Sequence, residues 1–188
     1  MIDVRPATDF EDVQTMVGPR NPDSNVCWCL SYRIPSKEHT ALRGPERGER
    51  VRRLMAEEGP IGVLAYDGDD VVGWAGVAPR SRTHFATFRK IPHIDELDVW
   101  SVWCLRVRPG HREKGITHAL LDGAVEFARQ SGAPALEGYP IDNDGARIDL
   151  TMAYVGTRAL FERHGFTKAA DTTSVLNGMP RVLMRRDF

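Results

Sequence analysis

The chain lacks the features of a membrane-spanning or secreted protein. Its 188 residues contain no run of about eighteen apolar residues, the length that a transmembrane helix needs. Residues 1–6 are polar where a secretory signal would begin its apolar core. Three cysteines, an odd number, do not make a disulfide framework. We therefore expect a cytoplasmic protein with no membrane partner.

The sequence also has little that would attract a metal ion or a nucleic acid. Cys27 and Cys29 are separated by one residue and lack the second pair of a four-ligand zinc site, so we expect no metal. The formal net charge is −1, which gives no overall field for a polyanion, although a local basic patch is compatible with it. We expect no nucleic-acid partner.

The residues that are present indicate one globular domain. With 41% hydrophobic and 27% charged residues, a chain of this length can bury one ample core, so a single domain over 1–188 is predicted. Apolar spacing and capping residues predict helices after a Thr8–Glu11 capping box, over 46–58, over 115–130, and from Thr157 to Gly165. β-rich runs predict strands at 2–5, 61–66, 71–77, 99–107, 135–139 and within 175–186. This order is typical of a mixed α/β sheet with helices on both faces.

Two segments do not fit regular elements. Residues 20–45 are rich in turn formers but contain a cluster of Cys27, Trp28, Cys29, Leu30 and Tyr32, which is too apolar for a free linker and is expected to fold over something. Residues 80–98 carry several basic side chains. A solvated basic loop is the favoured interpretation, and binding of an acidic acceptor or of a distal phosphate is the alternative.

The most informative stretch is 104–121, which reads as a strand, a tight loop and the start of a helix. The first N–H groups of a helix have no partner inside it and carry a partial positive charge. Gly115 lets the backbone approach a ligand, and Arg112 and Lys114 add full charges. The stretch predicts a binding site for a diphosphate.

Two motifs in this region resemble a known family. Residues 112–117, Arg-Glu-Lys-Gly-Ile-Thr, resemble the Arg/Gln-x-x-Gly-x-Gly/Ala loop of the GNAT acyltransferases, and residues 160–166 resemble their late helix ending in Gly-Phe. The resemblance implies a single-domain, mixed, mostly antiparallel sheet with a splayed central strand pair and helices on both faces. It also implies an acetyl-CoA-dependent N-acetyltransferase that moves acetyl directly to a primary amine of a small molecule or peptide.

The same resemblance assigns the cofactor contacts. The main-chain groups of Leu105 and Val107 would pair with the pantetheine arm. The pyrophosphate would be held by the amides of Arg112, Glu113, Lys114, Gly115, Ile116 and Thr117. Thr117 stands where the family usually has Gly or Ala, so its side chain must point away or donate its hydroxyl to a phosphate oxygen.

The usual catalytic positions are altered. Ser101 occupies the place of the family's glutamate base and Phe161 that of its tyrosine acid. We expect Glu137 to act as the base, with Asp142 second, and Tyr154 or Tyr139 as the acid unless water serves.

Cys104 lies in an apolar strand with no histidine placed to activate it. We therefore interpret it as a core residue and not as a nucleophile.

Other functions stay open. Ser101 and Phe161 also suit a non-catalytic acyl-CoA sensor or interaction domain. A nucleotide-binding protein is a weaker hypothesis, because Gly115 is not followed by the Lys-Ser/Thr pair of a P-loop.

The acceptor pocket is expected under residues 20–45 and 80–98, and small amines, amino-sugar antibiotics, amino acids and protein N-termini are all compatible with it. The sequence decides neither the acyl length nor whether the protein is a homodimer.

Overall fold

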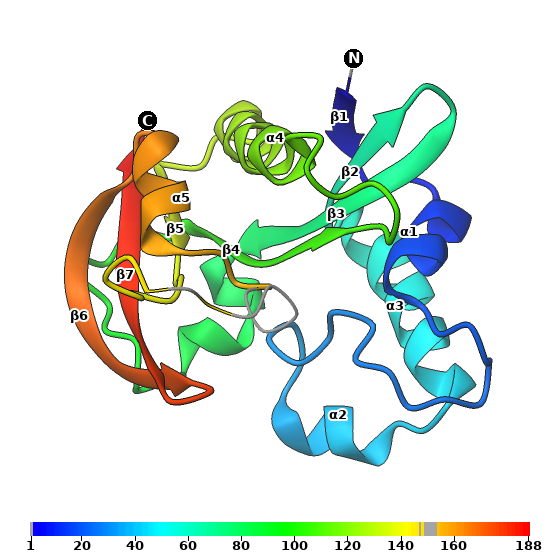
Figure 1. The fold of residues 1–188 in the computed structure, drawn as a ribbon. Coiled ribbons are helices and arrows are strands. Elements are labelled where there is room, and N and C mark those ends of the chain that lie inside the picture. Colours follow the sequence, from blue (N-terminus) through cyan, green and yellow to red (C-terminus); the bar gives the residue numbers. More distant parts are fainter. Residues whose placement is uncertain (1, 147, 149–153) are drawn as a thin grey trace.

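The computed structural model describes residues 2–146, 148 and 154–188, and its centre is a seven-stranded sheet (Figure 1). The strand order is β1-β2-β3-β4-β5-β7-β6. The strands are β1 (Ile2–Pro6), β2 (Gly62–Asp67), β3 (Asp70–Pro79), β4 (Trp100–Val107), β5 (Ala135–Gly138), β6 (Thr167–Leu176) and β7 (Met179–Asp187). The helices are α1 (Phe10–Val17), α2 (Ser36–Ala41), α3 (Pro45–Glu58), α4 (Ile116–Gln130) and α5 (Arg158–Arg163).

The central strands part from one another half-way along. β4 and β5 form the one parallel pair of the described sheet, and they pair only from Trp100–Val102 to Leu136–Gly138. β5 ends there, so the second half of β4, from Trp103 onward, has no strand beside it on that side among the described residues. The predicted mixed, mostly antiparallel sheet with a splayed central pair is confirmed.

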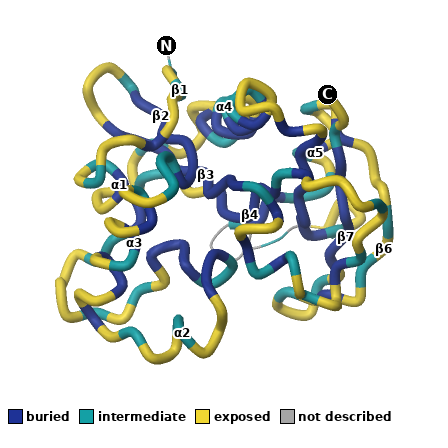
Figure 2. Tube along the Cα trace, turned by 180° about the vertical axis from the view of Figure 1, so that it is seen from behind, coloured by how far each residue is buried: buried dark blue, intermediate teal, exposed yellow. Residues whose placement is uncertain are grey.

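Helices cover both faces of the sheet, as Figure 1 shows. On one face α4 contributes Leu120 and Ala124 to a core that also contains Phe161 of α5. On the other face α1 and α3 pack their apolar sides around Trp74 of β3. Seen from behind in Figure 2, β3, β4 and β7 are largely buried, while α2 lies on the surface. None of the helices in the described ranges is both long and apolar enough to cross a membrane.

The segment 20–45 folds over the molecule's core, as its composition predicted, and its apolar cluster is part of that core. Trp28, Leu30 and Ile34 are buried, and the Trp28 ring stacks on Phe10 of α1 at 6.1 Å between centroids. α2 lies within this segment and was not predicted.

Two local predictions were wrong. The N-cap of α1 is Asp9 and not Thr8, because the Asp9 carboxylate accepts the N–H groups of Glu11 and Asp12 at 2.8 and 3.2 Å. The last hairpin begins at Thr167, not near 175. β6 is the edge strand of the sheet and most of its side chains are exposed, so it lacks the apolar run by which a strand is recognised.

Candidate active site

The loop between β4 and α4 has the conformation that the sequence predicted. Gly115 is the N-cap of α4 and is left-handed, with φ 73° and ψ 7°. A Cβ built on Gly115 would meet nothing within 4 Å, so glycine is favoured there by the backbone angle and not by crowding. No side chain in the described chain caps α4, which leaves its first N–H groups available to a ligand.

These N–H groups border a cavity of about 1160 Å³. Its walls come from four segments, namely the loop at 27–32, the splayed half of β4, the loop and first turn of α4, and residues 154–163. The described residues that line it include Cys27, Cys29, Ser31, Tyr32, Trp103, Cys104, Leu105, Arg106, Val107, His111, Arg112, Glu113, Gly115, Ile116, Thr117, His118, Tyr154, Thr157, Leu160 and Arg163. The cavity therefore joins the helix start to the gap in the sheet.

The cofactor residues expected from the resemblance mostly meet at this cavity. Leu105, Val107, Arg112, Glu113, Gly115, Ile116 and Thr117 all line it. The side chain of Lys114 points elsewhere, because its Nζ lies 3.4 Å from the carboxylate of Asp67 at the end of β2. Any contribution of Lys114 to the cavity is therefore through its backbone.

The two strand residues differ in what their backbone can offer. The Leu105 N–H donates to the carbonyl of Tyr154 at 2.6 Å and is already used within the chain. Arg108 donates its N–H to Val72 of β3, so Val107, one residue earlier, directs its N–H and C=O away from β3 and into the gap. Val107 is thus the better placed of the two to pair with an extended ligand.

Glu137 does not line the cavity but lies behind it. Its side chain is fully buried, and its carboxylate accepts hydrogen bonds from Arg80 at 3.0 Å, Tyr139 at 3.2 Å and Arg185 at 3.5 Å. Burial raises the pKa of Glu137, and the two guanidinium groups oppose that rise. Tyr139 also hydrogen-bonds the Ser101 hydroxyl at 2.8 Å, so the expected base and one expected acid belong to one internal network.

Arg80 is an exception to the interpretation of residues 80–98 as a solvated basic loop, in which Arg82, Arg89 and Lys90 are exposed as expected. Arg80 is only 5% exposed because it forms the buried ion pair with Glu137. The segment also contains two short 3-10 turns, at Arg80–Arg82 and His84–Ala86. The composition of residues 80–98 alone could not show that Arg80 is buried in an ion pair, since the partner carboxylate, Glu137, is on β5.

Tyr154 is the one expected catalytic side chain that lines the cavity. It precedes α5, whose N-cap is Thr157 as predicted, with the Thr157 Oγ1 accepting the Leu160 N–H at 3.3 Å. Gly156, at φ 78°, separates Tyr154 from the helix, so its placement comes from the turn and not from a longer helix. Burial and the neighbouring Tyr32 raise the pKa of Tyr154, which keeps its hydroxyl protonated as an acid requires.

Asp142 and Phe161, the other two positions considered for catalysis, are held by contacts outside the cavity. Asp142, the second candidate base, accepts a hydrogen bond from Arg158 at 3.2 Å and is not part of the cavity wall. Phe161 packs against Gly138 of β5, where a Cβ would lie 2.0 Å from its ring. Phe161 is therefore a core residue.

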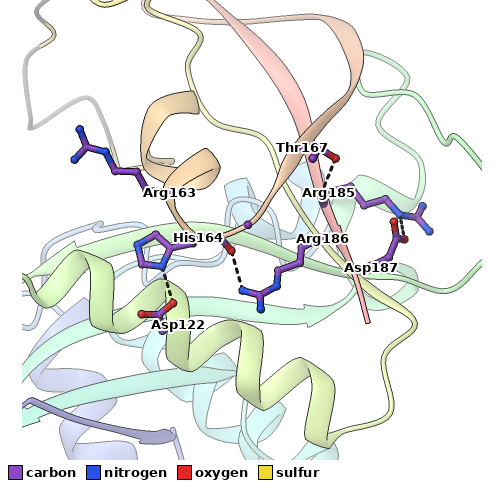
Figure 3. Close-up of a pocket in the computed structure, with 8 residues that line it drawn as sticks. Asp122, Arg163, His164, Thr167, Arg185, Arg186 and Asp187 are labelled. Atoms are coloured by element: carbon purple, nitrogen blue, oxygen red, sulfur yellow. Dashed lines mark hydrogen bonds and ion pairs between the residues drawn. The ribbon is translucent and has the colours of Figure 1, made fainter.

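A second pocket, of about 640 Å³, lies beside the C-terminal strand (Figure 3). Its charged groups are mostly paired within the chain: Arg185 with Asp187 at 2.7 Å, and His164 with Asp122 at 2.6 Å. His164 also contacts His118 at 2.8 Å, which reaches the rim of the first cavity. Because the larger cavity holds the free helix start and the strand gap, it is the candidate active site.

Sequence reasoning missed the residues that close the far end of the cavity. Cys29, Ser31 and Tyr32 come from the segment expected to fold over something, and that expectation was the available signal. His118 and Arg163 lie on helices that were predicted, but nothing local indicates that their side chains reach the cavity.

Comparison with known proteins identifies this arrangement. The pattern of the acetyltransferase (GNAT) family matches residues 28–166, more than half of the chain. The protein belongs to the GNAT acetyltransferase family. A comparison with curated protein sequences gives no match.

Solved structures show the same GNAT fold at low sequence identity. The ribosomal-protein-alanine N-acetyltransferase from Brucella melitensis is 19% identical with a TM-score of 0.59, covering 99% of each chain. The putative acetyltransferase yncA from Salmonella typhimurium, solved with its cofactor acetyl-CoA, is 16% identical with a TM-score of 0.57, covering 99% of this chain and 93% of that one. At these identities the likeness concerns the fold, while the family supports acetyltransferase activity with acetyl-CoA.

Proposed function

We propose that this GNAT protein is an N-acetyltransferase that moves acetyl from acetyl-CoA directly to a primary amine in a ternary complex. The observation that carries the proposal is the single cavity that joins the uncapped start of α4 to the gap beside β4. The first feature suits a diphosphate and the second suits an extended arm that pairs like an added strand.

The residues of the cavity fit acetyl-CoA along its length. The amides of Gly115, Ile116 and Thr117 would hold the pyrophosphate, with Arg112 adding charge. The backbone groups of Val107, which point away from β3, would pair with the pantetheine arm. The acetyl end would then lie toward Trp103, Cys104 and Tyr154, on the side closed by residues 27–32.

Transfer requires a neutral amine, stabilisation of the developing oxyanion and a proton for the departing thiolate. Tyr154 is the proposed proton donor, since it lines the cavity and its raised pKa keeps the hydroxyl protonated at neutral pH. Glu137 as base would act through two hydrogen-bonded side chains, Tyr139, which contacts its carboxylate, and Ser101 on β4, which contacts Tyr139. Holding amine and thioester together lowers the barrier by about 7 kcal/mol or more, so transfer can tolerate a poor base.

The acceptor pocket would lie under residues 27–32 and the neighbouring 3-10 turns. Tyr32 stacks on Phe85 at 4.9 Å between ring centroids, which gives this end an aromatic wall. Among the described residues that line the cavity, Glu113 is the only acid and belongs to the cofactor loop. These walls favour an amine carried on an apolar or aromatic body over a polycation.

Thiol release from acetyl-CoA, measured with a panel of primary amines, tests the proposal. Turnover on any amine, with intersecting initial-rate lines as a ternary complex requires, is the expected result. Tight acetyl-CoA binding by calorimetry with no turnover on any amine would instead indicate the acyl-CoA sensor, for which the buried position of Glu137 is the supporting observation.

A further inference from the structure

Two thiols from distant parts of the chain meet in the wall of the cavity. Cys29 belongs to the loop that follows α1 and Cys104 to the splayed half of β4, and both line the cavity while being only 8% exposed. Each thiol is among the groups that shift the pKa of the other. They lie at the end of the cavity away from the diphosphate loop, residues 112–117. The acyl group of the coenzyme is proposed to lie at the same end as the two thiols.

The surroundings of the pair give the two thiols different acidities. Burial raises the pKa of Cys29, but the neighbouring Cys104 and the indole N–H of Trp74 outweigh it and the net pKa is lowered. The Trp74 indole N–H lies 3.2 Å from the Cys29 sulfur. The pKa of Cys104 is raised by the neighbouring Cys29 and by burial. Cys29 is therefore the more acidic thiol of the pair and the better nucleophile of the two.

The backbone holds the Cys29 sulfur in position. Trp28 and Cys29 are both left-handed, with φ 53° and 59°, a conformation that costs free energy for residues other than glycine. Trp103 donates its indole N–H to the Cys29 carbonyl at 3.4 Å. A Cβ on Gly76 would lie 3.0 Å from the Cys29 sulfur, so the thiol packs directly on the backbone of β3.

We propose that Cys29 is a second acyl acceptor, which takes the acetyl group from acetyl-CoA when no amine occupies the acceptor pocket. This inference rests on the proposed function, because it uses the same bound coenzyme. It adds a self-acylation activity to direct transfer.

The reaction is a thioester exchange that needs no further reagent. The Cys29 thiolate attacks the thioester carbonyl, the new bond from sulfur to carbon forms, and the bond from that carbon to the coenzyme sulfur breaks. The coenzyme leaves as a thiolate with the electron pair and takes a proton from Cys104 or from water. One thioester replaces another, so nothing is oxidised or reduced.

Mass spectrometry of the reduced protein after incubation with acetyl-CoA and no amine tests the proposal. We expect the mass of one acetyl group to be added, peptide mapping to place it on Cys29, and hydroxylamine to remove it, as it does a thioester. Cys29→Ser should lose the label. The matched control is Cys27→Ser, which changes the exposed thiol two residues away and should still be labelled at Cys29.

Cys104→Ala tests the effect of Cys104 on Cys29. Without the Cys104 thiol, the pKa of Cys29 should rise, and each unit of rise lowers the thiolate fraction about tenfold below that pKa. We expect labelling of this variant to be at least about tenfold slower near neutral pH and to recover as the pH is raised, which a merely structural role of Cys104 would not produce.

Three outcomes separate the possibilities. Acetyl-CoA binding and amine turnover without acetyl on Cys29, or with the label on Cys27, Cys104 or lysine, would overturn this inference and leave the proposed function standing. A labelled Cys29 without turnover on any amine would support the inference and remove the N-acetyltransferase proposal. Absence of acetyl-CoA binding would overturn both. Because mapping is done on the native protein, a misfolded Cys29→Ser variant does not affect the test.

Discussion

The carboxylate of Glu137 accepts a hydrogen bond from Nη1 of Arg80 at 3.0 Å, and both side chains are almost fully buried. Replacing Glu137 by Gln would leave Arg80 and Arg185 inside the protein with less compensating charge. Breaking a buried ion pair in this way costs about 3 kcal/mol or more. We expect Glu137→Gln to lower the free energy of unfolding by that order, as measured by urea denaturation.

The same variant tests Glu137 as the base. If the carboxylate accepts the proton of the amine, the folded variant should have lower kcat and a pH profile of turnover shifted upward. Asp142→Asn tests the second candidate base in the same assays, and its ion pair with the partly exposed Arg158 is expected to contribute less than about 1 kcal/mol to stability. Lower stability with an unchanged kcat and pH profile would assign Glu137 to structure alone.

The diphosphate loop is tested by changing its charge and its helix start together. Arg112→Ala with Gly115→Asp removes one charged contact and places a carboxylate at the N-terminus of α4. We expect acetyl-CoA binding to weaken by about tenfold or more, measured by calorimetry. An unchanged affinity would contradict the placement of the pyrophosphate.

Two glycines of this loop allow the backbone to be tested separately. Gly110 and Gly115 have φ 87° and 73°, and neither has an atom near the position of a Cβ, so alanine at either should cost about 1 kcal/mol of stability through strain. Only Gly115 borders the cavity. We expect Gly115→Ala, but not Gly110→Ala, to weaken acetyl-CoA binding as well.

Tyr154 and Tyr139 are the two candidate acids, and because only Tyr154 lines the cavity, replacing each by Phe should have different effects on kcat and on stability. Tyr154→Phe should lower kcat with little change in KM for acetyl-CoA, because the hydroxyl is needed for the leaving thiolate. Tyr139→Phe should lower stability by about 1 kcal/mol, because it removes hydrogen bonds to Ser101 and Glu137 outside the cavity. If Glu137 is the base, Tyr139→Phe should also lower kcat, because the Tyr139 hydroxyl connects Glu137 to Ser101. Equal kcat for Tyr154→Phe and the wild type would remove Tyr154 as the acid.

Local signals predicted the parts of the site that are local in the chain. The helix start at Gly115 and the cap at Thr157 each depend on a few adjacent residues, so their types and spacing were sufficient. The family motifs then connected these elements to a cofactor.

The parts that could not be predicted depend on contacts between distant segments. Arg80 with Glu137, and Cys29 with Cys104, come from separate elements, and each residue read alone suggests a different role. Arg80 suggests a solvated loop and Cys104 an inert core residue. The polar edge strand β6 was missed for the opposite reason, since exposure removes the alternation that marks a strand.

Tyr66 gives a test of stability at alkaline pH. Its hydroxyl donates to the Asp12 carboxylate at 2.7 Å, and burial together with Asp12 raises its pKa from 10.0 to about 12. The folded state therefore keeps Tyr66 neutral where the unfolded chain ionises it. The stabilisation is complete below pH 10 and is lost as the pH rises toward 12, with a size on the order of 2 kcal/mol.

Tyr66→Phe removes the group that titrates while keeping the ring. At neutral pH the variant should be less stable than the wild type by about 1 kcal/mol, because the hydrogen bond to Asp12 is lost. Above about pH 10 this difference should shrink and then reverse toward pH 12, because the wild type alone loses the contribution of Tyr66 and that loss is larger than the hydrogen bond's share. Urea denaturation of both proteins at intervals from neutral to alkaline pH measures it, and a difference that stays constant would show that Tyr66 does not resist ionisation in the fold.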